Sequence, residues 1–154
     1  MYETGNSSAH DEYTHFLLSL IDFVKIECSY IDRAVWLNDQ RLTFTAPLVL
    51  RTGEVLSKQT AFYKGLAFEI INSKTEPDGE RLTVRGSLHR FKNNGGTNAD
   101  CYTLAEHIAT VKELKTFGIK PELTRLNSYE FGVNIQTDKP AKVVKNALVS
   151  IPDK

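Results

Sequence analysis

The stretch TLAEHIATVKELKTFGIKPELTRLNSYEFGVNIQ, Thr103 to Gln136, decides the fold, because its apolar residues change period part-way along. In the first half they recur at helical spacing, and Thr103 with Glu106 forms the T-x-x-E capping box that begins a helix. Gly118 stands where a helix ends. From Leu126 to Gln136 apolar and polar residues alternate, as in a half-buried strand. The stretch therefore predicts a helix followed by a strand.

Upstream of this stretch the chain is rich in strand patterns joined by short turns. The predicted strands are Asp22–Ile31, Arg41–Leu50, Val55–Tyr63, Leu66–Ile71 and Arg81–Phe91. Short glycine-bearing links between such runs indicate antiparallel hairpins. Downstream, Asp138 and Pro140 open a second, short helix. We therefore predict an α+β fold, with a mainly antiparallel sheet and one long helix and a short C-terminal helix packed on one face.

Length and composition are those of one globular domain. The chain has 154 residues, of which 41% are hydrophobic and 25% charged, close to the average for such domains. We expect residues 1–20 to be a polar lead-in and residues 21–154 to form a single domain. The longest apolar stretch, Phe16 to Val24, is too short to span a bilayer, and no basic segment precedes it. We expect a cytoplasmic protein with no membrane partner.

The charges are unevenly distributed, although the net charge is zero. Residues 1–40 carry two basic and seven acidic side chains, whereas residues 81–120 carry seven basic and three acidic. A protein that binds many phosphates usually has a net basic surface. In this chain a basic surface is expected only locally, around Arg85, Arg90 and Lys92.

The first candidate site follows the last upstream strand, in the segment Gly86–Tyr102, which is basic and rich in glycine. His89, Arg90 and Lys92 are candidates for contacts to phosphates, with Asn98 as a hydrogen-bonding partner. The alternative is a surface connection between strand and helix, in which Gly and Asn take positive φ and the charges are solvated. The residues alone favour this alternative.

The second candidate site is the predicted strand that carries Glu130 and Asn134 on one side, with Gly132 between them. A carboxylate and an amide oxygen suit Mg²⁺ or Mn²⁺, which prefer oxygen ligands. The alternative is a solvent-facing strand side, or a carboxylate paired with Arg85 or Arg125; the residues alone favour it. No His or Cys spacing typical of a metal site, no phosphate-binding Walker loop and no nucleophile elbow occurs in the sequence.

Both sites belong to a longer pattern. GSLHRFKNNGGTNADCYTLAEHIATVKELKTFGI followed by LTRLNSYEFGVNI resembles a block in the replication initiators of phages and plasmids, including filamentous-phage-type and Bacteroidetes members. The upstream order also fits, with IDFVKI before a TGE…S…FYKGL hairpin. The resemblance runs from Ile21 to Leu148.

The resemblance implies an origin-binding protein, the N-terminal portion of a longer initiator. Such initiators nick one DNA strand through a tyrosine that becomes linked to the 5′ phosphate, with a divalent metal polarising the scissile phosphate. It implies DNA, single-stranded or hairpin, as the partner and Mg²⁺ or Mn²⁺ as the metal. The basic residues and the loop asparagine described above, Arg85, His89, Arg90, Lys92 and Asn98, are then the candidate DNA contacts, and the resemblance implies Glu130 as the metal ligand.

Departures from the family pattern leave the chemistry open. The histidine-hydrophobe-histidine motif of many rolling-circle nickases is absent, and so is the downstream K-x-Y-D-K strand of the relatives. No tyrosine is therefore assigned as nucleophile, and whether this chain is an enzyme stays open. Two alternatives remain: a stand-alone nucleic-acid-binding or regulatory module without chemistry, and a protein-interaction domain.

Overall fold

The computed structural model describes residues 20–72 and 79–132. The predicted lead-in, Asn134 and the predicted helix after Asp138 lie outside the described residues. Within the described part the chain is α+β with a mostly antiparallel sheet, which confirms the predicted fold class.

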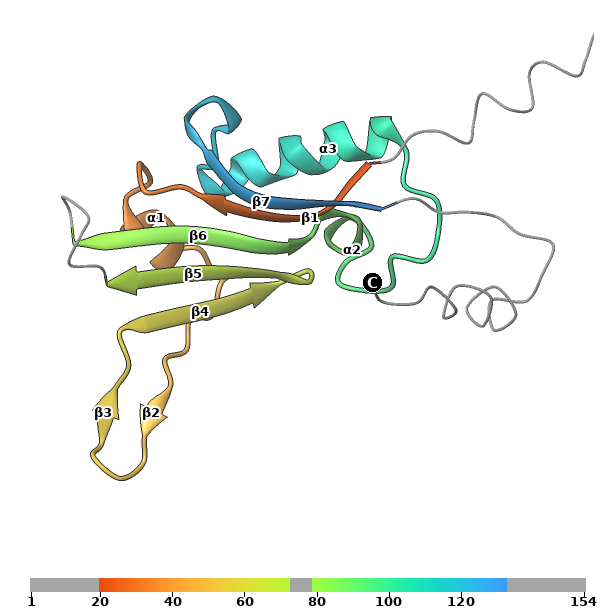
Figure 1. Cartoon of the computed structure of the whole chain (residues 1–154). Coiled ribbons are helices and arrows are strands. Elements are labelled where there is room, and N and C mark those ends of the chain that lie inside the picture. The colour runs from red at the N-terminus through yellow and green to blue at the C-terminus, as the bar shows by residue number, and fades with distance from the viewer. Residues whose placement is uncertain (1–19, 73–78, 133–154) are drawn as a thin grey trace, which may run out of the picture. The chain divides into compact units, whose positions relative to one another are not determined.

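The main sheet has five strands in the order β4-β5-β6-β1-β7, and every neighbouring pair is antiparallel (Figure 1). Its strands are β1 (Leu20–Glu27), β4 (Lys58–Tyr63), β5 (Leu66–Asn72), β6 (Glu80–Ser87) and β7 (Arg125–Gly132). The first strand in the chain thus lies between β6 and the last described strand. A separate two-stranded hairpin, β2 (Leu48–Val49) with β3 (Glu54–Val55), precedes β4.

The helices pack on one face of the sheet. They are α1 (Arg33–Leu37), α2 (Leu88–Lys92), α3 (Leu104–Leu114) and two 3₁₀ turns, η1 (Lys115–Phe117) and η2 (Pro121–Leu123). The predicted long helix is confirmed in part: α3 begins with the full capping box between Thr103 and Glu106, but it ends at Leu114, and the last predicted turn is the 3₁₀ turn η1. Gly118 ends η1 at a φ of 80°, as the sequence predicts.

The core lies between these helices and the sheet. Trp36 of α1 is fully buried, packs edge-on against Phe68 of β5, and donates a hydrogen bond from Nε1 to the carbonyl oxygen of Phe117 at 2.9 Å. Because the indole N–H has a partner, this large ring is buried without an unsatisfied donor. Strand side chains alternate accordingly: Val24 and Ile26 of β1 face the helices, and the residues between them face the other way.

Three predicted strands are wrong in part. The strand predicted over Arg81–Phe91 ends at Ser87, because the Ser87 hydroxyl accepts the backbone N–H of Arg90 and begins α2. Most of Arg41–Leu50 is not strand; its pairing within the described residues is one bridge, Thr45 to Thr60, and the short β2. The first strand ends at Glu27, before the short helix α1 that was not predicted.

The longest described helix, α3, has 11 residues. Within the described residues, no helix has both the length and the apolar character needed to cross a membrane.

Candidate nucleic-acid interface

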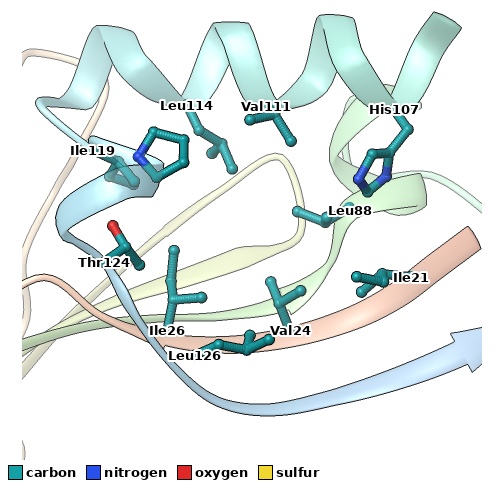
Figure 2. A pocket seen from close by; sticks show the side chains of 11 residues that line it. Ile21, Val24, Ile26, Leu88, His107, Val111, Leu114, Ile119, Thr124 and Leu126 are labelled. Atoms are coloured by element: carbon teal, nitrogen blue, oxygen red, sulfur yellow. The ribbon is translucent and has the colours of Figure 1, made fainter. Parts of the chain in front are cut away.

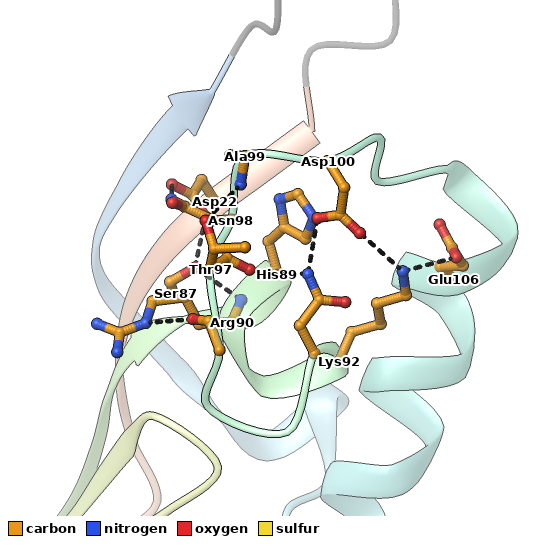
Figure 3. A network of polar contacts seen from close by, with 12 residues as sticks. Asp22, Ser87, His89, Arg90, Lys92, Thr97, Asn98, Ala99, Asp100 and Glu106 are labelled. Atoms are coloured by element: carbon orange, nitrogen blue, oxygen red, sulfur yellow. Dashed lines mark hydrogen bonds and ion pairs between the residues drawn. The ribbon is translucent and has the colours of Figure 1, made fainter.

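The loop after α2 is fastened to β1 by a chain of polar contacts (Figure 3). The Ser87 hydroxyl donates to Oδ1 of Asp22 at 2.5 Å, and the Asn98 side chain donates to Oδ2 of the same carboxylate at 3.0 Å. Asp22 sits at an irregularity in the pairing of β1 with β7, which leaves it out of that ladder. Asn98, a predicted DNA contact, therefore anchors the loop to the sheet.

Arg90 is exposed and holds the turn of the same loop. Its Nε donates to the carbonyl oxygen of Gly96 at 3.0 Å and its Nη2 to that of Gly95 at 3.2 Å. Asn94 and Gly95 have φ angles of 54° and 86°, the positive values that the sequence predicts for this turn. Arg90 thus donates hydrogen bonds to two carbonyl oxygens of the tight turn.

His89 is buried and stacks on Tyr102, with ring centroids 4.7 Å apart and planes 8° from parallel. Its Nε2 lies 2.7 Å from Oδ1 of Asp100, although the direction of approach is not that of a hydrogen bond. A hydrogen bond from Asn93 lowers the pKa of Asp100, and His89 adds to this effect. The buried His89 ring therefore packs against Tyr102 at the end of the loop.

Lys92 joins the loop to α3. Its Nζ lies 3.0 Å from Glu106 and 3.5 Å from Asp100. The backbone N–H of Thr103 and the Lys92 ammonium together lower the pKa of Glu106 to about 2. His89, Arg90, Lys92 and Asn98 thus all have partners in the loop, in β1 or in α3. Their contact with phosphates stays a prediction.

The face of the sheet opposite the helices, here called the open face, carries the remaining predicted residues. Near its centre Glu69 is buried, with Lys58 at 2.6 Å and Nε of Arg85 at 2.8 Å, and Thr83 donates a third contact at 3.2 Å. Burial alone would raise the pKa of Glu69, but the bonds from Lys58 and Arg85 outweigh it and lower the pKa. Glu69 therefore fixes the Arg85 guanidinium on the open face.

One row of cross-strand neighbours on this face combines an aromatic ring with two cations. The register places Phe62, Ala67, Arg85, Lys25 and Ser128 side by side on five successive strands. Phe62 is 71% exposed. Arg85 contacts Glu69 through Nε, and in the described part of the chain neither of its terminal amino groups has a partner.

The open face as a whole is more basic than acidic. By strand register its basic residues are Lys25, Lys58, Arg81, Arg85 and Arg125, and its acidic residues are Glu27, Glu69 and Glu130. This local excess lies on a chain whose net charge is zero.

Glu130 lies on the open face, opposite Phe23 of β1, and is exposed. Its side chain forms no ion pair with Arg85, Arg125 or any other described residue. No group of three or more His, Cys, Asp or Glu side chains comes together among residues 20–72 and 79–132. Its role as a metal ligand stays a prediction, and Asn134, its predicted neighbour, lies outside the described residues.

The four described tyrosines, Tyr30, Tyr63, Tyr102 and Tyr129, all occupy positions away from the open face. Tyr63 and Tyr129 belong to strands but lie on the helix side, and burial raises the pKa of Tyr102. Tyr129 is next to Glu130 in the chain, but its side chain lies on the opposite face of the sheet and so does not meet the Glu130 carboxylate.

No protein-family model, curated protein or solved structure matches this chain. The candidate interface therefore stands on the geometry and on the resemblance in sequence.

Sequence reasoning missed Lys25, Phe62 and the anchoring role of Asp22. A signal for Phe62 was present: it alternates with the helix-side residues Ala61 and Tyr63, which places it beside Thr60 and Lys58 on the polar side of β4. An aromatic residue on the polar side of a strand is a candidate for base stacking. Asp22 gave no local signal, because its partners Ser87 and Asn98 are 65 and 76 residues away.

Proposed function

We propose that this chain binds single-stranded DNA on the open face of its sheet, as the origin-contacting N-terminal part of a rolling-circle replication initiator. The observation that carries the proposal is one cross-strand row, in which Phe62 of β4 and Arg85 of β6 lie on either side of the small Ala67 of β5, and Lys25 of β1 follows Arg85. The proposed role in replication rests on the resemblance of the segments around His89 and Glu130 to phage and plasmid initiators.

The row has the two components of a single-strand binding surface. Proteins that bind single strands combine cations that follow the backbone with aromatic rings on which bases stack. Phe62 offers an exposed ring, and Lys25 and Arg85 offer positive charge. Because Glu69 holds the Arg85 side chain in place, little side-chain entropy remains to be lost when it meets a phosphate.

Fluorescence anisotropy with a labelled single strand tests the proposal. Phe62→Ala removes the stacking ring and is expected to weaken binding by about 1–3 kcal/mol, the usual contribution of one base on an aromatic ring. Lys25→Ala is expected to flatten the slope of log K against log salt by roughly 0.7, as for one lost phosphate contact on single-stranded DNA.

Arg51→Ala is the matched control, because Arg51 is an exposed cation in the β2–β3 turn, away from the open face. It is expected to leave both the affinity and the salt slope unchanged. Equal losses in Arg51→Ala and Lys25→Ala would show that the binding is a general charge effect and would overturn the proposal.

The nicking activity is a second part of the proposal, and Glu130 is its candidate residue. Its exposed carboxylate lies on the same face as the row, and Mg²⁺ and Mn²⁺ bind to such oxygens. A supercoiled plasmid with the cognate origin, incubated with Mn²⁺, is expected to be nicked by the intact initiator but not by its Glu130→Gln variant. DNA binding without nicking in both proteins would favour the stand-alone binding module instead.

A further inference from the structure

The two outer strands of the main sheet differ in what their outer edges bind. The edge of β4 is occupied at its middle, where Thr45 and Thr60 exchange two backbone hydrogen bonds of 3.0 and 2.8 Å. β7 pairs with β1 on its inner side, and among the described residues no other backbone group is bonded to residues 125–131. Because unpaired N–H and C=O groups of an outer strand are a template for a further strand, β7 is the candidate edge for association.

The side chains of β7 are exposed on both faces of the sheet, over the whole of residues 125–131. On the helix side, Leu126, Tyr129 and Phe131 are 49%, 51% and 61% exposed. The two rings pack edge to face, with centroids 5.0 Å apart. Three large apolar side chains along one side of an outer strand are typical of a surface that another chain covers.

A bulge in β7 decides which of its residues share a face. Between Lys25 and Ile26 of β1 the pairing passes over Asn127, which is therefore an extra residue in β7. The Asn127 amide donates to Oε2 of Glu27 at 3.3 Å, so it lies with Ser128 on the open face. In a regular strand, residues five positions apart lie on opposite faces. Across this bulge they lie on the same face.

Two pairs of residues that flank the bulge show this effect. Arg125 and Glu130 are five positions apart, and both lie on the open face. Leu126 and Tyr129 are three positions apart, and both lie on the helix side. Figure 2 shows Leu126 on this side, in the wall of an apolar cavity of about 250 Å³ below α3.

These positions make β7 complementary to a second, antiparallel copy of itself. In one register the cross-strand pairs are Arg125 with Glu130, Leu126 with Tyr129, and Asn127 with Ser128, each formed twice by the twofold symmetry. Both members of every pair then lie on the same face of the joined sheet, as antiparallel neighbours must.

The charges favour this register. Neither Arg125 nor Glu130 forms an ion pair with another residue of the described ranges, so both charges are available to a second copy. The register places each carboxylate opposite a guanidinium, twice across the interface. A shifted register that set Glu130 opposite itself would bring like charges together, which is unfavourable for neighbouring strands.

We propose that two copies of the chain pair through β7 in this register and so join their two five-stranded sheets into one. Both copies use the same surface, so the interface is closed and assembly ends at the dimer. The proposal concerns assembly and does not depend on DNA binding by the open face.

Sedimentation equilibrium with charge-reversed variants tests this arrangement. Arg125→Glu makes both ends of the β7 edge negative, and Glu130→Arg makes both ends positive. The unchanged chain is expected to dimerise, and each variant alone is expected to do so more weakly by roughly tenfold or more. An equimolar mixture of the two variants is expected to recover the dimer, because a negative edge meets a positive one.

The conditions and the control isolate this pairing. Divalent metal is left out of the buffer, because a cation bound to Glu130 would compete with Arg125 of the second copy. Arg51→Glu is the matched control, since it reverses an exposed cation in the β2–β3 turn, and it is expected to leave the dimer unchanged. The proposal is overturned by an unchanged chain that stays monomeric, by single variants that dimerise normally, or by a mixture no stronger than its components.

A second measurement needs no variant, should circular dichroism show that a reversal disturbs folding. Unchanged chains labelled with carbon-13 are mixed with unlabelled chains, and isotope-filtered NMR detects contacts between copies. Contacts between Leu126 of one copy and Tyr129 of the other are expected. A dimer without them would contradict the pairing.

Discussion

At the scale of single residues, Glu69 makes the clearest prediction. Its carboxylate is buried under Lys58 and Arg85, so Glu69→Gln leaves both cations without their charge partner. Because the two cations are partly exposed, we expect a modest fall in the free energy of unfolding, about 1–2 kcal/mol at neutral pH. Urea denaturation measures it, with Glu54→Gln at an exposed position as the control.

The same residue predicts a dependence on pH. The pKa of Glu69 in the folded chain is below its ordinary value of 4.5, so its stabilising effect is complete above that value. The effect is lost as the pH falls through the lower, folded-state pKa. The difference in stability between the unchanged chain and Glu69→Gln should therefore shrink as the solution is acidified below pH 4.5. A constant difference across that range would contradict the ion-pair account.

Single residues also show what can and what cannot be predicted from the sequence. Glu69 lies inside the apolar run LAFEII, and nothing local indicates that two distant cations cover it. Contact of His89 and Arg90 with phosphates stays a prediction; their partners in the structure, Asp100 and Gly96, belong to a loop whose path depends on Asn98 meeting Asp22. The spacing of apolar residues predicts on which face of a strand a side chain lies, whereas its hydrogen-bond and ion-pair partners depend on tertiary contacts.

At the scale of elements, β5 and β6 approach too closely at one end for a side chain. Gly86 has a φ of 145°, and a Cβ there would lie 2.7 Å from the carbonyl oxygen of Gly65. We expect Gly86→Ala to lower the stability by about 2 kcal/mol or more, through strain and overlap together. Gly53→Ala is the matched control: its φ is also positive, at 70°, but no atom lies within 4 Å of the added carbon.

The capping box of α3 gives a second prediction at this scale. Thr103→Ala removes the hydroxyl that accepts the N–H of Glu106, and we expect a loss of about 1 kcal/mol. Thr103→Ser keeps the hydroxyl and should remain close to the unchanged chain. Thermal melts followed by circular dichroism compare the three proteins; equal melting of the alanine and serine variants would show that the cap contributes nothing.

The long helix could be predicted from the sequence because its cap is followed by a clear helical period, whereas the two five-residue helices could not. The capping box of Thr103 and the glycine at 118 mark this helix in the sequence, and in the structure α3 begins at that cap and η1 ends at that glycine. The alternation of β6 continues through Leu88 and so predicts strand where the structure has α2, which begins at the Ser87 cap. α1 has only five residues and one cap, Asp32, too short for its period to be visible.

At the scale of the described domain, the order of the strands brings the residues of the candidate nucleic-acid interface together. β1 pairs with both β6 and β7, and this places Lys25 beside Arg85 although sixty residues separate them in the chain. Such long-range antiparallel pairing cannot be derived from local patterns. Helices on one face then leave the other face, with Phe62, available to a ligand.

The most direct test of this account is a nitrogen-15 chemical-shift titration of the chain with a short single-stranded DNA. We predict that the amide signals of Lys25, Phe62, Arg85 and Ser128 move together and saturate, while those along α3 stay in place. Movements confined to α3 or to the loop after α2, or no movement at low salt, would contradict the assignment of the open face as the DNA-binding surface.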